Sequence, residues 1–169
     1  KFQLGWLNYE VAFAGAKSEH KLGPAEANTK QAQGLFVVLP DKEVTTVISA
    51  PYAGSKFYYS GAGDDVDNTM TRSVALPAGA ALSAKVKFQI ELDWDYAYLT
   101  VNGTPVATNL STATNPNGQN FGNGITGSSG GVWVDLTADL SAYGGQTVAI
   151  GFRYWTDGAV VEPGFMVDE

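Results

Sequence analysis

The sequence contains no cysteine among its 169 residues and only one histidine, His20. The lack of cysteine excludes disulfides, thiolate zinc sites and cysteine nucleophiles. A catalytic zinc usually takes about three protein ligands, normally including two or more histidines. His20 lies in neither a His-Glu-x-x-His nor a Gly-x-Ser-x-Gly motif, and no Gly-x-x-x-x-Gly-Lys loop occurs. We therefore assign no catalytic residues and expect this chain not to be an enzyme by itself.

Positive charge is also scarce. The chain has 10 Lys and Arg against 17 Asp and Glu, a net charge of −7. Phosphate backbones and anionic membranes are therefore poor partners, and we expect no nucleic acid. No apolar run approaches the ~18 residues of a membrane helix, and the chain opens on Lys1 and Phe2 without a basic-then-apolar leader. We expect a piece of a longer protein, whose acidic, cysteine-free composition fits secretion to the bacterial exterior.

Long helical patterns are missing, while the chain is 44% hydrophobic and has 20 glycines. Short apolar runs separated by Gly, Asn and Pro clusters predict an all-β protein, an antiparallel β-sandwich of the jelly-roll type. The clearest strand is 82–92, with period-two alternation. Its predicted core face comprises Ala84, Val86, Phe88, Ile90 and Leu92. Further strands are predicted at 34–40, 43–49, 132–137, 146–155 and 164–168.

Turn signals complete this pattern. Asn102-Gly103 predicts a type I′ hairpin turn within 96–110, and Pro105 suits an edge or a strand start. The segment 137–145 predicts a single helical turn closed by glycine. In 146–155 the inward residues are expected to be Val148, Ile150, Phe152 and Tyr154.

The first 50 residues differ from the rest in composition and in the clarity of their strand patterns. They read as a short N-terminal β extension, in which 34–40 and 43–49 form a hairpin. We expect residues 1–50 to link from the end of an upstream domain, and 51–169 to form the sandwich. The polar segment 111–131 predicts a long loop, either a flexible connection or a functional one.

Acidic residues are concentrated in Gly-Asp-Asp-Val-Asp-Asn. Asp64, Asp65 and Asp67 fall within four positions and repel one another unless water or a cation separates them. Calcium takes six to eight hard oxygen ligands, which such a cluster supplies in part. The segment is no EF-hand, because Met70 stands where that loop needs glycine. A calcium site with distant ligands near the C-terminus and a solvated turn capping its own backbone both remain open.

A second acidic pair, Asp93 and Asp95, lies beside Trp94 and Tyr96. Paired carboxylates near aromatic rings are typical of glycosidases, but such pairs also serve as ion ligands or turn caps. The aromatic residues offer another alternative, a carbohydrate- or surface-binding module. Its candidate residues are Trp94, Trp133, Trp155, Tyr58 and Tyr59, and no substrate-binding residue is assigned.

Several separated blocks carry a family resemblance. They include KFQLGWLNYE, HKLGPAEANTKQAQGLFVVLP, YYSGAGDDVDNTMTRSVALP, DWDYAYLTV and DLTADLSAYGGQTVAIGFRYWTDG, with PGFMVDE at the end. This series resembles the region downstream of the catalytic domain in the immune-inhibitor-A-like family of secreted bacterial zinc metallopeptidases. The resemblance covers essentially the whole chain, although the family pattern continues beyond Glu169.

The resemblance implies a non-catalytic accessory domain with structural Ca²⁺. Catalytic Zn²⁺ would belong only to an upstream domain of the parent protein, with which this chain would pack. The positions that match calcium-associated motifs are Asp64, Asp65, Asp67 and Asp168, with Asp93 before the DYAY strand. We expect the ion to support the protease or its engagement of substrate or a glycan or protein surface.

Overall fold

The computed structural model describes residues 9–15, 19–24, 31–40 and 48–169. The chain divides into two compact units, Lys1–Thr46 and Val47–Glu169. The hairpin expected between 34–40 and 43–49 involves residues 41–47, which lie outside the described residues.

The first unit contains β1 (Tyr9–Phe13) and β2 (Gly34–Val38), which pair in parallel with Tyr9 opposite Gly34. The predicted strand at 34–40 is therefore confirmed, and its partner in the structure is β1. Tyr9, Phe13 and Phe36 are each at least half exposed. Because parallel sheets normally have both faces covered, this small sheet is not a self-sufficient core.

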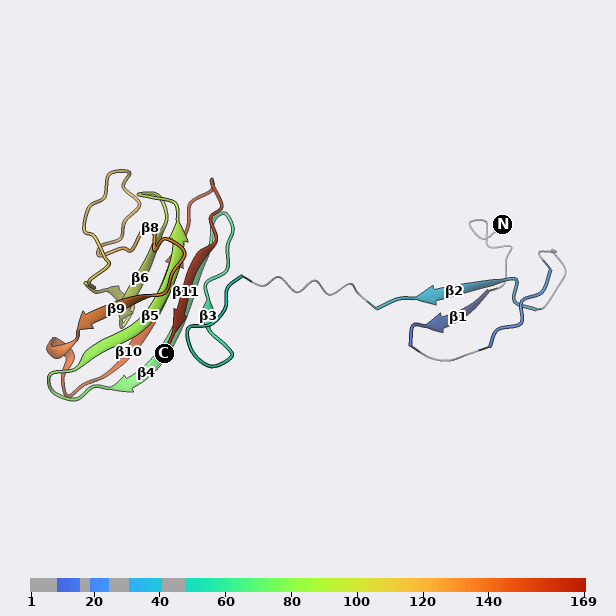
Figure 1. The fold of residues 1–169 in the computed structure, drawn as a ribbon, viewed down its shortest axis with the longest axis horizontal. Helices are drawn as coiled ribbons and strands as arrows, with labels where there is room; N and C mark the ends of the chain where they lie inside the picture. Colours follow the sequence, from blue (N-terminus) through green and yellow to red (C-terminus); the bar gives the residue numbers. More distant parts are fainter. Residues whose placement is uncertain (1–8, 16–18, 25–30, 41–47) are drawn as a thin grey trace. The chain divides into compact units, whose positions relative to one another are not determined.

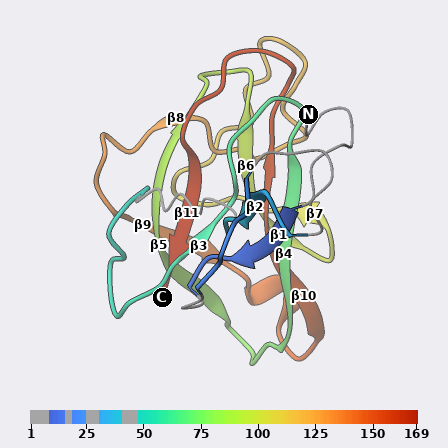
Figure 2. The same cartoon turned by 90° about the vertical axis from the view of Figure 1, so that its right-hand side faces the viewer.

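The second unit is a β-sandwich of two antiparallel sheets, as predicted. One sheet has the order β4-β10-β6-β7, and the other β3-β11-β5-β8 with β9 beside β5. Figure 2 shows β5 and β11 in one layer and β4, β6 and β10 in the other. The bounds are β3 Tyr58–Tyr59, β4 Asp67–Ala75, β5 Ala81–Ile90, β6 Tyr96–Val101, β7 Thr104–Pro105, β8 Gly127–Ser128, β9 Val134–Asp139, β10 Thr147–Trp155 and β11 Gly164–Asp168.

The core lies between the two sheets. In β5 the alternation holds, because Ala84, Val86, Phe88 and Ile90 are all buried. The exception is Leu92, predicted on the core face, which is 65% exposed. It lies beyond the end of β5, where the chain turns and the period-two rule no longer applies.

The turn predictions are confirmed. Asn102 and Gly103 have φ of 51° and 81°, as a type I′ turn requires, and they join β6 to β7. The helical turn is a 3₁₀ helix at Ser141–Tyr143. Gly145 follows with φ of 79°.

The strand β4 was not predicted. Its sequence, DNTMTRSVA, is polar because it is the edge of its sheet and only Met70 and Val74 are partly buried. Edge strands commonly carry charged side chains, which discourage pairing with another chain, and few of the residues of β4 lie in the core.

The segment 48–57 crosses the outer face of the five-stranded sheet. The backbone N–H groups of Tyr52 and Ala53 donate to Asp168 Oδ2 at 2.8 and 3.1 Å. Trp133 Nε1 donates to the Ala50 carbonyl at 3.1 Å, and its ring meets the edge of Phe57. We call residues 48–57 the strap.

The long polar segment after β7 is ordered by its own hydrogen bonds. Ile125 pairs with Ala97 of β6 through an antiparallel backbone bridge, and Phe121 stacks on Tyr98 at the outer face of the four-stranded sheet. A Cβ on Gly124 would lie 2.5 Å from Tyr96 Cδ1, so only glycine fits there. Tyr96 and Tyr98 are consequently fully buried on a face that would otherwise be exposed. We call residues 111–126 the covering loop.

Candidate functional site

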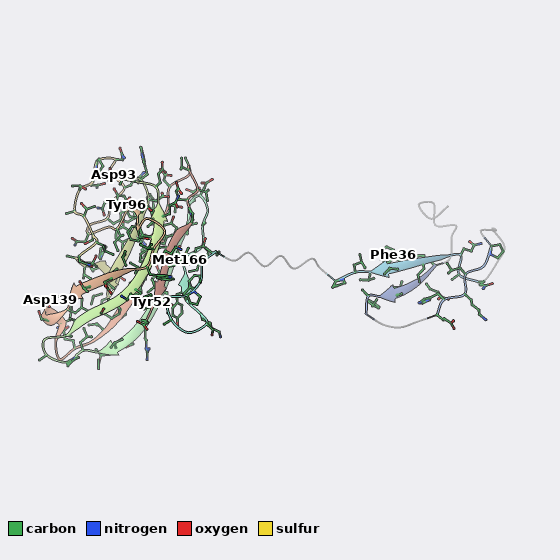
Figure 3. All side chains as sticks on the ribbon, in the orientation of Figure 1. Phe36, Tyr52, Asp93, Tyr96, Asp139 and Met166 are labelled. Atoms are coloured by element: carbon green, nitrogen blue, oxygen red, sulfur yellow. The ribbon has the colours of Figure 1, made fainter. Side chains whose placement is uncertain are left out.

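Three connections meet at one end of the sandwich. They are the β3–β4 loop (60–66), the β5–β6 turn (91–95) and the β10–β11 loop (156–163). Figure 1 shows these connections at the end where β5 finishes and β11 begins. Figure 3 places Asp93 at this end, and Tyr52 and Asp139 toward the other.

Three carboxylates converge there. Glu91, Asp95 and Asp157 each place one oxygen within 4.8 Å of the others. Calcium binds its ligands at about 2.3–2.6 Å, so oxygens on opposite sides of one ion are about 5 Å apart. The three groups can therefore contact one calcium ion together.

Asp95 is the buried member of this cluster, with only 1% of its surface exposed. Its Oδ1 accepts a hydrogen bond from the Asp157 backbone N–H at 2.9 Å. Burial raises the pKa of Asp95 to about 6, and the charges of Asp157, Glu91 and Asp64 add to the rise. The pKa of Glu91 is raised by burial and by Asp157 and Glu162. The site thus disfavours its own negative charge unless a cation is bound.

A buried phenol lies within electrostatic reach of the cluster. Tyr154 is 2% exposed, and its hydroxyl has no hydrogen-bond partner among the described residues. Burial raises the pKa of Tyr154, and the charge of Asp95 is the next contribution, so the two groups are within electrostatic reach. A buried hydroxyl without a protein partner is uncommon in folded proteins.

Thr156 fixes the β3–β4 loop relative to the β10–β11 loop. Its hydroxyl donates to the Gly63 carbonyl at 2.9 Å and accepts from the Val66 N–H at 2.8 Å. The Thr156 N–H donates to the Val66 carbonyl, and the Asp65 N–H to the Asp157 carbonyl. The acidic β3–β4 loop is therefore held against the end of β10, next to the carboxylate cluster.

Of the five aspartates predicted as calcium ligands, Asp64 and Asp65 approach this cluster from the β3–β4 loop. The charge of Asp64 raises the pKa of Asp95, which places the two within electrostatic reach. Asp65 adopts a left-handed φ of 53°, and its carboxylate lies beside Gly158 in the β10–β11 loop. Neither is among the three converging carboxylates.

Asp93 shares the β5–β6 turn with the cluster. It has φ of 66°, and its N–H donates to the Thr126 hydroxyl at 3.0 Å. That hydroxyl in turn donates to the Glu91 carbonyl, so Thr126 stabilises the turn that carries Glu91 and Asp95.

Asp67 and Asp168 have other partners. Asp67 makes two hydrogen bonds with Arg153, Nε to Oδ1 at 2.7 Å and Nη2 to Oδ2 at 2.8 Å. Asp168 holds the strap and pairs in register with Lys85, six residues before Glu91. At about 3.3 Å per residue, it lies roughly 20 Å along β5 from Glu91. One ion therefore does not contact both.

Glu91 and Asp157 were missed as candidate ligands. Asp95 was considered only as half of the pair with Asp93. The signal for Glu91 was its place four residues before Asp95 at the end of a strong strand. No sequence signal pointed to Asp157, because only the fold brings the β10–β11 loop to the end of β5.

The aromatic candidates do not form one strip. Trp94 is 40% exposed in the β5–β6 turn, and Trp133 packs on Phe57 under the strap. Trp155 lies on the outer face of the four-stranded sheet, where Phe121 meets it edge-on at 5.1 Å between ring centroids.

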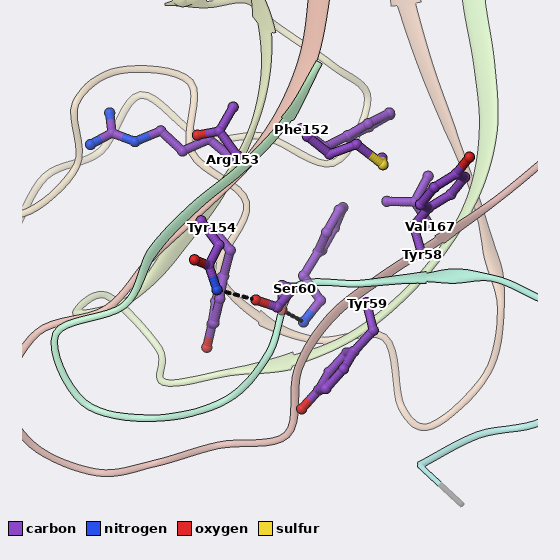
Figure 4. Close-up of a pocket in the computed structure, with 11 residues that line it drawn as sticks. Tyr58, Tyr59, Ser60, Phe152, Arg153, Tyr154 and Val167 are labelled. Carbon is purple, nitrogen blue, oxygen red and sulfur yellow. Dashed lines mark hydrogen bonds between the residues drawn. The ribbon is translucent and has the colours of Figure 1, made fainter. Parts of the chain in front are cut away.

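A cleft runs between the two sheets along β4. It consists of two neighbouring cavities of about 330 and 550 Å³ that share Tyr58, Met70, Phe152 and Val167. Figure 4 shows Tyr58, Tyr59 and Ser60 on one side of the first cavity and Phe152 and Tyr154 on the other. The cleft is lined mostly by side chains that point between the two sheets, and we assign it no function.

His20 does not join a metal centre with other described residues. Its Nδ1 lies 2.5 Å from Glu10 Oε2 in the first unit. Among the described residues, only Glu91, Asp95 and Asp157 satisfy the geometry of a metal-binding group. The structure also contains no described helix of the length and apolarity needed to cross a membrane.

Comparison with known proteins finds a family and individual relatives that agree with each other. Residues 18–169 match the family described as Immune inhibitor A-like, MAM domain. The chain is 44% identical over 135 residues to Pre-pro-metalloprotease PrtV of two Vibrio cholerae serotype O1 strains, covering 79% of the chain and 14% of PrtV. It is 31% identical over 164 residues to Immune inhibitor A of Bacillus thuringiensis subsp. alesti, covering 96% of the chain and 23% of that protein.

The chain thus spans less than a quarter of the length of these relatives. The resemblance seen in the sequence is confirmed. This chain belongs to the Immune inhibitor A-like MAM domain family.

Proposed function

We propose that this chain is a non-catalytic accessory domain of a secreted bacterial metalloprotease, and that calcium stabilises it. The observation that carries the calcium proposal is the convergence of Glu91, Asp95 and Asp157 from connections far apart in sequence. An ion there would join the β5–β6 turn to the β10–β11 loop. It would thereby hold together the two sheets at one end of the sandwich.

Calcium fits this group better than magnesium or zinc. All three side chains offer carboxylate oxygens, which are hard ligands, and the second unit contains no histidine or cysteine. Magnesium demands near-ideal octahedral geometry, whereas calcium accepts the irregular set that three loops provide. Asp64 and Asp65, beside the cluster, are proposed to add ligands directly or through water. The roles predicted for Asp67, Asp93 and Asp168 as ligands stay untested.

The first unit is proposed to pack against an upstream catalytic domain. Two parallel strands with half-exposed Tyr9, Phe13 and Phe36 require further cover. PrtV is a metalloprotease by name, and both PrtV and Immune inhibitor A are several times longer than this chain. Zinc and peptidase chemistry would then belong to that other domain, because a single histidine does not make a zinc hydrolase centre.

A terbium titration tests the calcium proposal directly. Tb³⁺ resembles Ca²⁺ in size and ligand preference, and Trp94, adjacent to Asp95, is a sensitiser for its luminescence. We expect saturable emission that calcium displaces. Asp157→Asn and Glu91→Gln should each weaken binding by about tenfold or more, since each removes a charged ligand.

Asp139→Asn is the matched control, because Asp139 is exposed and its Oδ1 accepts from the Ser141 N–H at the opposite end of the sandwich. Unchanged binding in Asp157→Asn and Glu91→Gln would reject this ligand set. Loss of binding in Asp139→Asn to the same extent would show that only overall charge matters.

A further inference from the structure

We propose that the outer face of the four-stranded sheet carries a binding subsite for a neutral pyranose unit of a glycan. Its residues are Phe121, Trp155, Arg153 and Asp67. None of them belongs to the carboxylate cluster, so the inference does not rest on calcium. It assigns a ligand-binding role to the covering loop, through the one large apolar side chain in its middle.

Phe121 is exposed to solvent rather than buried. The residue is 49% exposed, although three side chains contact its ring. The ring stacks on Tyr98 at 6.0 Å and 28°, meets Trp155 edge-on at 5.1 Å, and lies 5.0 Å from Arg153 Cζ. The Arg153 guanidinium lies over the ring, and about half of the residue's surface still faces solvent. An apolar ring in water has an unfavourable hydration free energy that a ligand would remove.

The loop that carries Phe121 is held rigidly. The Phe121 N–H donates to the Tyr98 hydroxyl at 3.1 Å. The Asn120 side chain donates to the Thr112 and Thr114 carbonyls and accepts from the Gly122 N–H. Binding at Phe121 would therefore order no flexible segment, and this lowers the entropic cost of association.

The neighbouring charges indicate a neutral ligand. Arg153 and Asp67 neutralise each other through two hydrogen bonds. The guanidinium has five N–H donors and the carboxylate about four acceptor positions, so each keeps unused capacity. An anion would be repelled by Asp67 and a cation by Arg153. Hydroxyl groups can both donate and accept, and so suit this pair.

The surrounding strand residues match this chemistry. Thr69 lies opposite Arg153 in the β4–β10 register, and Thr71 opposite Gly151. Both threonines are exposed on the same outer face. A flat aromatic ring beside a bidentate ion pair and two hydroxyls has the mixed character of a sugar, with one apolar C–H face and a polar rim.

The test is calorimetric titration of the full chain with three neutral probes, chitotetraose, cellotetraose and mannotetraose. We expect at least one to bind with a millimolar or lower Kd, about −4 kcal/mol or better. Phe121→Ala and Arg153→Lys should each weaken binding by about tenfold, because they remove the platform and the fork geometry. Circular dichroism melts confirm that each variant is folded.

Trp94→Ala is the matched control, since Trp94 is an exposed aromatic residue outside the subsite. It should change the affinity less than about twofold. If Phe121→Ala fails to fold, Arg153→Lys and Asp67→Asn carry the test. The proposal is overturned if none of the three probes binds at a probe concentration of about 10 mM, which is well above the millimolar Kd expected for a weak site. It is also overturned if the subsite variants bind as the parent does, or if Trp94→Ala alone abolishes binding.

Discussion

Asp95 is the residue whose ionisation most affects the end of the sandwich. Its pKa rises from an ordinary 3.8 to about 6, chiefly through burial. The folded state therefore retains a proton that the unfolded chain has lost. The stabilising effect of this difference is fully present below pH about 4 and disappears as the pH rises to about 6 and above.

The metal-free protein should show this pH dependence. We expect the Tm in EDTA to fall between pH 4 and pH 6.5 and to fall less in saturating calcium, where the ion stabilises the carboxylates. The measurement is a series of melts in both conditions. A Tm in EDTA that rises across this range would contradict the assigned burial of Asp95.

Asp95→Asn separates charge from packing. The amide oxygen can still accept from the Asp157 N–H, but the side chain carries no charge. In EDTA at pH 7 we therefore expect a higher Tm than that of the parent, and in calcium a lost response. Melts of the parent and of Asp95→Asn with and without calcium check this. A variant less stable than the parent in EDTA would mean that the carboxylate is satisfied without an ion.

Single residues also mark the limit of prediction from sequence. The sequence identified the acidic β3–β4 loop and Asp95 as candidate ion ligands, but it did not identify the residues that lie beside them in the fold. Asp67 was predicted as a calcium ligand, and nothing in the sequence indicated that Arg153, 86 positions later, donates hydrogen bonds to both of its carboxylate oxygens. Such pairings depend on register across β4 and β10, which composition does not give.

At the scale of elements, the strap depends on Asp168. Its carboxylate accepts from two backbone N–H groups of the strap and from the Glu169 N–H. Asp168→Ala should leave the two strap donors unpaired and lower the free energy of unfolding by about 1–3 kcal/mol. We expect this loss with and without calcium, because Asp168 is remote from the cluster.

Hydrogen exchange at Tyr52 and Ala53 provides the local readout, and both amides should exchange faster in Asp168→Ala. Glu169→Gln, an exposed neighbour, serves as control and should leave them protected. If Asp168→Ala destabilises only in calcium, Asp168 is a metal ligand after all.

The covering loop depends on Asn120. Removing its side chain in Asn120→Ala deletes three hydrogen bonds to the loop backbone. We expect faster proteolytic cleavage within 111–126 and a Tm lower by several degrees, at roughly 2–4 °C per kcal/mol. Thr114→Ala, exposed on the same loop, should cleave nearly as the parent does. Equal cleavage of both variants would contradict the rigidity assigned to this loop.

Strongly periodic elements were predictable, and polar ones were not. Strands β5 and β10 alternate because each has one face in the core, so their inward residues could be read directly. Strand β4 and the covering loop are polar, and their order comes from edge pairing and side-chain hydrogen bonds. The glycine at 124 and the amide of Asn120 decide that order, and neither has a periodic signature.

At the scale of the whole molecule, the second unit holds the sandwich core and should fold without the first. Deleting residues 1–46 should leave the Tm of the sandwich unchanged within about 2 °C, less than a kcal/mol. It should also reduce the binding of an apolar dye, because Tyr9, Phe13 and Phe36 are removed. A large drop in Tm would show that the two units share a core.

The most direct test of the central claim is a thermal melt of this chain in EDTA and then in a few millimolar CaCl₂. At about 100 times the Kd, calcium should stabilise the fold by about 2.7 kcal/mol. That is a rise of roughly 5–10 °C, reversed by chelation. No shift in the parent would contradict calcium stabilisation and leave the acidic cluster as a solvated end of the sandwich.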